Sequence, residues 1–241
     1  RRVQLPTYPF QRSHQWFEPN KGGAFSAGRG QSLHALLGCQ VPSALKTRLF
    51  EGRLTDQNPN YLKDHVVQGS IVVPGAAYVE MALAAAQQAF GEGAHVVEDF
   101  SIQQPLFLAP NSDRVTQVSV SPETAGEVTV EIYSCLPDAD KSEWTMHACG
   151  QLRHADVAAK DEGASMDVSE LINDGDAYSR EHIYEMITKR GLAYGPMFQV
   201  LGTVHRGKDS AVADVDLPEA TQNQLKDYHL HPALLDGMLQ M

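Results

Sequence analysis

The alanine-rich stretch from Gly75 to Ala89 limits what this chain can fold into more than any other feature. After Gly75 neither glycine nor proline interrupts it, and alanine has the highest intrinsic helix propensity of any residue. Gly91 and Gly93 follow and predict where the helix stops. Because alanine side chains are short, strands can approach such a helix closely. We therefore predict a buried central helix.

Strand patterns lie on both sides of this helix. Residues 33–56 combine short β-like runs with Gly38, Pro42 and Gly52, which predicts a hairpin region. After the helix, apolar or alternating runs separated by turn residues predict an antiparallel meander. These runs are Val96–Ile102, Val115–Ser121, Glu127–Ser134 and Trp144–Arg153. One helix surrounded by antiparallel strands indicates an α+β unit.

A second, shorter pattern follows a polar linker at residues 156–167. Its amphipathic helix, its two strands and its last helix are expected at Tyr178–Lys189, Phe198–His205, Ala211–Leu217 and Pro232–Met241. We divide the chain into a strap and linker (1–31), a first unit (32–155), the linker (156–167) and an incomplete second unit (168–241). A helix without its meander leaves a buried face uncovered, so we expect the natural polypeptide to continue past Met241.

Charge and cysteine content exclude several classes of protein. The chain has 30 acidic and 19 basic residues, a net charge of −11, which argues against nucleic-acid binding and against anionic membranes. The chain contains no run of about 18 apolar residues, so no membrane span is predicted. The three cysteines, Cys39, Cys135 and Cys149, show no zinc-like spacing and favour a reducing compartment, so we expect a cytoplasmic protein.

His65 is the first candidate for acid–base chemistry. It lies in an apolar, β-branched segment that Pro74 and Gly75 end, at the predicted opening of the central helix. Desolvation there favours the neutral imidazole that a general base requires. Free N–H groups at the helix start can stabilise negative charge on an acyl oxygen. The alternative is a structural histidine bonded to a backbone carbonyl.

Asp236 is the second candidate, in a mostly apolar helical segment. Gln240 lies four residues on and shares its helix face, so its amide can hydrogen-bond and orient the carboxyl. Burial raises the pKa of a carboxyl group, as a general acid near neutral pH requires. The alternative is a helix residue paired with solvent or with a nearby base. His229 and His231 lack a third ligand of suitable spacing, so we expect no metal site.

Three ordered motifs in this chain resemble those of the dehydratase domain of modular type I polyketide synthases. His65, Gly69 and Pro74 match His-x-x-x-Gly-x-x-x-x-Pro, and Asp236 with Gln240 matches Asp-x-x-x-Gln/His. A third set matches Gly-Tyr-x-Tyr-Gly-Pro-x-Phe, with Leu192 in place of the first tyrosine: Gly191, Tyr194, Gly195, Pro196 and Phe198. Residues 5–16 also resemble the trailing edge of an acyltransferase domain.

The resemblance implies a double hotdog fold, in which each antiparallel sheet wraps a central helix, with the second hotdog apparently truncated. It places His65 in the first hotdog and Asp236 in the second, facing each other across a tunnel. The substrate would arrive on the phosphopantetheine arm of an acyl carrier protein. The implied partners are the neighbouring acyltransferase, ketosynthase and ketoreductase domains and a second copy of the chain, as a homodimer.

The implied reaction is removal of water from a β-hydroxyacyl thioester, with His65 as the base and Asp236 as the acid. Six further residues are expected to position the substrate: Tyr194, Gln240, Gly69, Pro74, Pro196 and Gly75, the last through its N–H. No intrinsic cofactor or metal is required. Two alternatives remain open: the same pair shifts a double bond or closes a ring by oxa-addition, or the domain is a non-catalytic scaffold.

Overall fold

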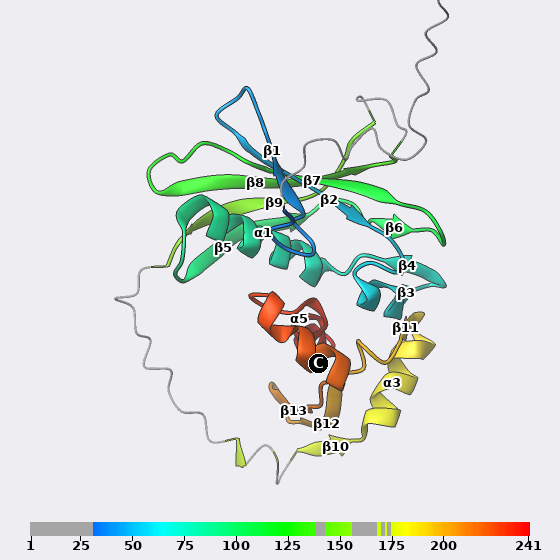
Figure 1. Cartoon of the computed structure of the whole chain (residues 1–241). Helices are drawn as coiled ribbons and strands as arrows, with labels where there is room; N and C mark the ends of the chain where they lie inside the picture. The colour runs from blue at the N-terminus through cyan, green and yellow to red at the C-terminus, as the bar shows by residue number, and fades with distance from the viewer. Residues whose placement is uncertain (1–30, 138–142, 156–167, 170–171, 173–174) are drawn as a thin grey trace, which may run out of the picture.

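The computed structural model describes residues 31–137, 143–155, 168–169, 172 and 175–241 (Figure 1). The expected strap and linker at residues 1–31 lie outside the described residues except for residue 31. The expected linker at 156–167 also lies outside them. The two halves on either side of that linker are both described, and they carry the candidate site.

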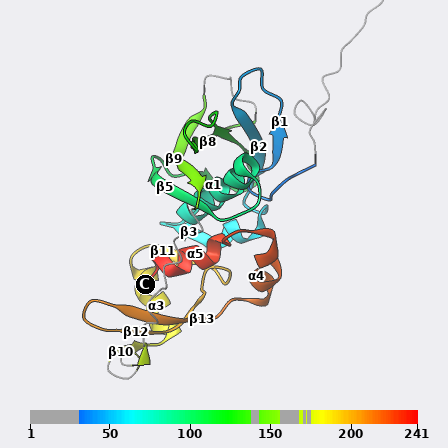
Figure 2. The ribbon, with the colours of Figure 1, turned by 90° about the vertical axis from the view of Figure 1, so that its left-hand side faces the viewer.

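The first half is an antiparallel sheet wrapped around one helix. Helix α1, Gly75–Phe90, lies along the sheet face in Figure 1, and Figure 2 shows the sheet curving around it. The strand order is β1 (Cys39–Val41), β2 (Arg48–Leu54), β7 (Arg114–Val120), β8 (Glu127–Cys135), β9 (Thr145–His154) and β5 (His95–Ile102). The predicted buried central helix and the predicted hairpin of β1 and β2 are thereby confirmed.

The composition of α1 explains how closely the sheet surrounds it. Ala77, Met81 and Ala85 are fully buried and belong to one core cluster with the inward residues of the sheet. Small side chains let sheet and helix interdigitate at the close packing typical of protein interiors. Gly91 ends the helix at φ +88°, a left-handed conformation that glycine adopts without steric cost.

The predicted meander is correct only in part. Strands β7, β8 and β9 follow one another in the sheet, but β5 pairs with β9 at the edge, and β2 takes the place beside β7. The reason is β6, Phe107–Leu108, which lies between β5 and β7 in the sequence and pairs with β4 of another sheet. The chain therefore leaves the large sheet after β5 and re-enters it next to β2.

A small sheet joins the two halves of the molecule. Its order is β11 (Leu192–Tyr194), β3 (His65–Val67), β4 (Ser70–Val72) and β6. β11 comes from the second half and pairs with β3 of the first. The hairpin between β3 and β4 has a two-residue loop with positive φ at both residues, +48° at Gln68 and +79° at Gly69. Such a loop favours glycine, which accounts for Gly69.

The described residues of the second half include a three-stranded sheet and the helices α3, α4 and α5. The sheet order is β10 (Asp176–Tyr178), β12 (Leu201–Arg206) and β13 (Ala211–Val215). These helices span Arg180–Lys189, Glu219–Gln224 and Pro232–Leu239, and a short 3-10 helix occupies Leu225–Asp227. A second short 3-10 helix, Asn60–Asp64, lies in the first half directly before β3. Helix α5 packs against α1, so the two halves also meet through their helices.

Two predicted starting positions in this half are wrong, each for a local reason. The helix expected from Tyr178 begins at Arg180, because the Ser179 hydroxyl caps its first turn by accepting from the His182 N–H at 3.4 Å. The strand expected from Phe198 begins at Leu201. The Phe198 N–H instead closes a turn onto the Gly195 carbonyl at 3.0 Å, and the Phe198 ring is fully buried.

No helix among the described residues is both long enough and apolar enough to cross a membrane. Two further expectations, the cytoplasmic location and the homodimer, are not tested by the fold and stay predictions.

Candidate active site

His65 is held in one orientation by a backbone carbonyl. Its side chain is almost completely buried in β3, and Nδ1 lies 2.7 Å from the carbonyl oxygen of Val72 in β4. A carbonyl only accepts, so Nδ1 carries the hydrogen, and in the neutral ring Nε2 keeps a free lone pair. The carbonyl bond that a structural histidine would make is therefore present, and it also prepares Nε2 to accept a proton.

Asp236 faces that nitrogen from the other half of the molecule. Its carboxyl group projects from α5, the side chain is buried, and Oδ1 lies 3.8 Å from His65 Nε2. Burial raises the pKa of Asp236, and this effect outweighs the Gln240 hydrogen bond and the His65 charge, which lower it. A carboxyl group with a raised pKa retains its proton at higher pH than an exposed aspartate, as an acid catalyst must.

The predicted partnership of Asp236 and Gln240 is confirmed. Gln240 Nε2 donates to Asp236 Oδ2 at 2.9 Å, across one turn at the end of α5. The second hydrogen of the same amide group points to the Phe198 carbonyl at 3.2 Å. The carboxyl group thus has one oxygen held by Gln240 and the other turned to His65.

Aromatic rings enclose the imidazole. The rings of Tyr194 and Phe198 have their centroids 5.3 Å and 5.1 Å from that of His65, and Tyr194 is its direct register partner across the β11–β3 pair. Burial, and to a smaller extent the Asp236 charge, raises the pKa of Tyr194 to about 12. Its hydroxyl therefore stays protonated near neutral pH and can donate a hydrogen bond.

A cavity of about 290 Å³ opens beside His65 at the start of α1. Its lining includes Gly75, Tyr78 and Ile102, and a Cβ atom on Gly75 would lie only 2.8 Å from Ile102 Cδ1. Glycine at this position leaves room for the Ile102 side chain beside the helix start. The N–H groups of the first turn of a helix carry partial positive charge and favour an acyl oxygen. Asp236 lies outside the described lining of this cavity.

Three predicted site residues occupy backbone turns around this centre. Gly69 lies in the β3–β4 hairpin, Pro74 immediately precedes the first residue of α1, and Pro196 lies in the turn that follows Tyr194. Each is placed to shape the path of the chain that carries His65, Gly75 or Tyr194. Their predicted part in holding a substrate stays a prediction.

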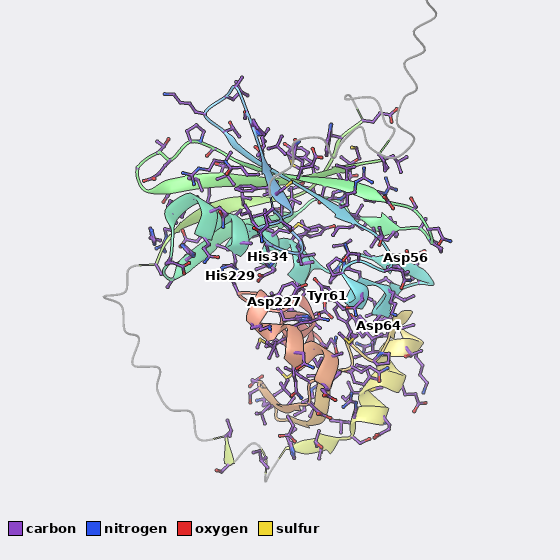
Figure 3. All side chains as sticks on the ribbon, in the orientation of Figure 1. His34, Asp56, Tyr61, Asp64, Asp227 and His229 are labelled. Atoms are coloured by element: carbon purple, nitrogen blue, oxygen red, sulfur yellow. The ribbon has the colours of Figure 1, made fainter. Side chains whose placement is uncertain are left out.

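Asp64 fixes the relation between the two halves, and the sequence reasoning missed it. Its carboxylate accepts from the Met197 N–H at 2.9 Å, and its carbonyl accepts from the Gly195 N–H at 2.7 Å. A Cβ atom on Gly195 would come within 2.5 Å of the Asp64 side chain, so the turn requires glycine. Figure 3 shows Asp64 at the junction of the halves, one residue before His65.

Glu80 is the second residue that the sequence reasoning missed. It is completely buried on α1 and accepts from the N–H groups of His229 at 2.9 Å and Leu230 at 2.8 Å, just before α5. His34 Nε2 lies 3.1 Å from the same carboxylate, and Figure 3 shows His34 and His229 side by side between the halves. The signal was present, because Glu80 is the only charged residue in the stretch from Gly75 to Ala89.

The electrostatics of Glu80 make this connection sensitive to acid. Burial raises the pKa of the Glu80 carboxyl, but hydrogen bonds from His34, Leu230 and His229 outweigh that effect and leave the pKa below its usual range. A carboxylate with a depressed pKa in the folded state stabilises the fold at neutral pH. This contribution is lost as the pH falls through the folded-state pKa.

We expect His231 to add a second loss of stability on acidification. Burial lowers the pKa of His231 to about 4, and its Nδ1 caps α5 by accepting from the Ala233 N–H at 3.2 Å. An unfolded histidine titrates near pH 6.5, so below about that pH the unfolded chain binds a proton that the folded chain does not bind, and the folded state loses stability. The His231→Asn variant keeps a capping acceptor. As the pH falls from 7 to 4.5, its melting temperature should fall less steeply than that of the parent protein.

The matched control is His182→Asn on the exposed face of α3. This variant should leave the dependence of melting temperature on pH unchanged. An equal slope for His231→Asn and the parent protein would contradict this role of His231.

Comparison with known proteins agrees with this arrangement. The family model described as "Polyketide synthase dehydratase domain" matches residues 34–135, and the model described as "Polyketide synthase dehydratase N-terminal domain" matches residues 167–241. Polyketide synthase GfsE of Streptomyces halstedii is 35% identical over 245 residues, which cover 99% of this chain and 6% of that protein. The chain thus spans a small part of the length of this relative.

Solved structures extend the likeness to the fold. The dehydratase domain from the CurK module of curacin polyketide synthase has a TM-score of 0.79 and 29% identity, covering 86% of this chain and 74% of that one. A trans-AT synthase dehydratase domain from Brevibacillus brevis has a TM-score of 0.76 and 31% identity, covering 88% and 78%. Two further CurK dehydratase structures are inactive mutants, one with histidine replaced by phenylalanine and one with aspartate replaced by asparagine.

These matches confirm the predicted α+β hotdog fold class, with a wrapped helix in the first half and a helix-bearing second half that contributes Asp236. This chain belongs to the family of polyketide synthase dehydratase domains.

Proposed function

We propose that this chain is a hydro-lyase that converts a β-hydroxyacyl thioester to an α,β-unsaturated thioester and water. The observation that carries the proposal is the approach of His65 Nε2 to Asp236 Oδ1 at 3.8 Å, each from a different half and each nearly buried. One group is prepared to take a proton and the other to give one. A site with two such groups suits elimination, because one group removes a proton from the α-carbon while the other protonates the hydroxyl oxygen on the neighbouring β-carbon.

The proposed step balances without any further reactant. His65 Nε2 takes the α-proton, which the thioester carbonyl acidifies, and the electron pair of that C–H bond becomes the new double bond. The bond from the β-carbon to its hydroxyl oxygen breaks, and Asp236 supplies the proton that lets this oxygen leave as water. Transfer of one proton from the resulting imidazolium to the Asp236 carboxylate restores both groups.

Two features of the site can stabilise the reacting groups. The N–H groups that open α1 at Gly75 border the cavity beside His65, where a thioester oxygen would acquire negative charge. Tyr194 keeps its hydroxyl proton because burial raises its pKa to about 12, and it packs against the His65 ring. We assign Gly75 to the thioester carbonyl and Tyr194 to the β-hydroxyl.

The same reasoning extends to the partners. We propose that the substrate is carried on the phosphopantetheine of an acyl carrier protein and that the chain works beside other synthase domains. Support comes from relatives that are named polyketide synthases and are far longer than this chain. The inactive CurK mutants further support the catalytic pair, since histidine and aspartate are the residue types replaced in them.

The direct test is incubation of the purified protein, in its native full-length form, with a β-hydroxyacyl pantetheine thioester. Mass spectrometry should find a product lighter by one water, with the new double bond next to the carbonyl. An unsaturated substrate whose double bond moves at constant mass, while the hydroxyacyl substrate stays intact, would favour an isomerase. No turnover of either substrate would favour a scaffold. The comparisons favour neither of these alternatives.

A further inference from the structure

Tyr184 on α3 makes a closed set of hydrogen bonds behind the candidate acid. Its side chain is buried, and its hydroxyl accepts from the Leu201 N–H at 3.0 Å. The hydroxyl has two acceptors in reach for its hydrogen, Gln240 Oε1 at 3.1 Å and the Phe198 carbonyl at 3.3 Å, and the shorter contact is the one to Gln240. Tyr184 therefore connects α3 to the residue that holds Asp236.

These bonds leave the Gln240 side-chain amide one satisfactory orientation. As placed, its oxygen meets a donor, the Tyr184 hydroxyl, while its two hydrogens meet acceptors on Phe198 and Asp236. Rotating the amide by half a turn would bring its oxygen against the Phe198 carbonyl oxygen. It would also leave the Tyr184 hydroxyl without its partner on Gln240. The approach of two carbonyl oxygens is unfavourable, and the Tyr184 hydroxyl would keep only its longer contact with the Phe198 carbonyl, so the orientation as placed is preferred.

The orientation of the amide decides which oxygen of neutral Asp236 carries the proton. Oδ2 accepts a hydrogen bond from Gln240 at 2.9 Å, and the unprotonated oxygen of a neutral carboxyl group is the better acceptor of the two. The Gln240 hydrogen bond therefore favours the proton on Oδ1. Oδ1 is the oxygen that lies 3.8 Å from His65 Nε2, at the place where the reaction needs it.

We propose that Tyr184 is a positioning residue that holds the Gln240 amide so that the acidic proton of Asp236 sits on Oδ1. The proposal rests on the proposed dehydratase function and adds a residue that none of the three motifs contains. Tyr194 also packs against the small core cluster that contains Tyr184, but the hydrogen-bonded route from Tyr184 to Asp236 runs through Gln240. The effect of Tyr184 should therefore fall on the proton transfer and not on substrate binding.

The test is Tyr184→Phe, which removes one hydroxyl and keeps the ring in its packed position. Without its donor, the amide of Gln240 turns in part of the molecules and presents its oxygen to Asp236. We expect kcat at neutral pH to fall about three- to tenfold, the equivalent of one lost hydrogen bond, with KM unchanged. The basic limb of the kcat–pH profile should move to higher pH, because the Gln240 hydrogen bond lowers the pKa of Asp236.

Tyr178→Phe is the matched control. Tyr178 lies next to Tyr184 in the small core cluster of the second half, and its ring stacks on His182. Removal of its hydroxyl should leave the pH profile and kcat unchanged. Thermal unfolding of both variants separates a loss of folded protein from a change in the chemistry.

A double-mutant cycle decides whether Tyr184 acts through Gln240. Gln240→Ala should itself shift the basic limb upward and lower kcat, and adding Tyr184→Phe to it should change neither further. If the two losses instead multiply, or if Tyr184→Phe leaves the basic limb in place, the proposal is overturned. A parent protein that fails to release water from the β-hydroxyacyl thioester would overturn the proposed function itself, which distinguishes the two failures.

Discussion

His65→Phe is expected to remove dehydration while leaving a folded protein. Phenylalanine fits the aromatic surroundings formed by Tyr194 and Phe198, whose rings lie within 5.3 Å of the imidazole centroid. It has no atom that takes the α-proton in place of Nε2. General base catalysis contributes about 10²–10⁴-fold, so we expect kcat/KM to fall by at least about a hundredfold. Loss of water from a β-hydroxyacyl pantetheine thioester, followed by mass spectrometry, measures this directly.

A loss of stability must be separated from this loss of chemistry. The variant leaves the Val72 carbonyl without the Nδ1–H that lies 2.7 Å from it, at a cost of about 1–3 kcal/mol. His154→Phe is the matched control, because His154 Nε2 also lies near a backbone carbonyl, that of Phe90 at 3.2 Å, on the same half of the molecule. His154→Phe should keep its activity. Retention of the parent rate by folded His65→Phe would show that another group is the base.

The fold was predictable where its cause is local. The helix at Gly75–Phe90 follows from its alanine content, and its end follows from the glycine at position 91. The pairing of β11 with β3 was not predictable, because three-residue strands carry no measurable alternation and their partners are distant in the sequence. The place of β5 was missed for a similar reason, since the two-residue β6 that redirects the chain has no periodic pattern.

The residues of the candidate site were likewise predictable only where their causes are local. His65 and Asp236 were named from apolar surroundings, and their pairing came only from the resemblance. Gln240 was predictable because residues four apart share a helix face. Asp64 and Tyr184 act through long-range hydrogen bonds, which leave no trace in spacing or composition. A charged residue inside an apolar helix can be recognised from sequence as needing partners, but those partners are identified only by the fold.

Asp236→Asn should have a second large effect on activity and an opposite effect on stability. Asparagine keeps the shape of the side chain but has no proton to give to the β-hydroxyl, so kcat should fall by about a hundredfold or more. The parent protein should lose activity as the pH rises through the raised pKa of Asp236, because the acid must be protonated. Any residual activity of Asp236→Asn should lack that descending limb in the pH–rate profile.

The stability of Asp236→Asn follows from the same raised pKa. The folded state binds the proton of Asp236 more readily than the unfolded chain does, so ionisation of this group costs stability as the pH rises from the unfolded value through the folded one. Asparagine has no charge to bury. The melting temperature of Asp236→Asn, measured relative to that of the parent protein, should therefore be higher at pH 8 than at pH 4. The exposed Asp209→Asn should show no such gain. An equal difference at both pH values would mean that the ionised carboxylate is tolerated at no cost, and Asp236 would then be ionised too readily to serve as the acid.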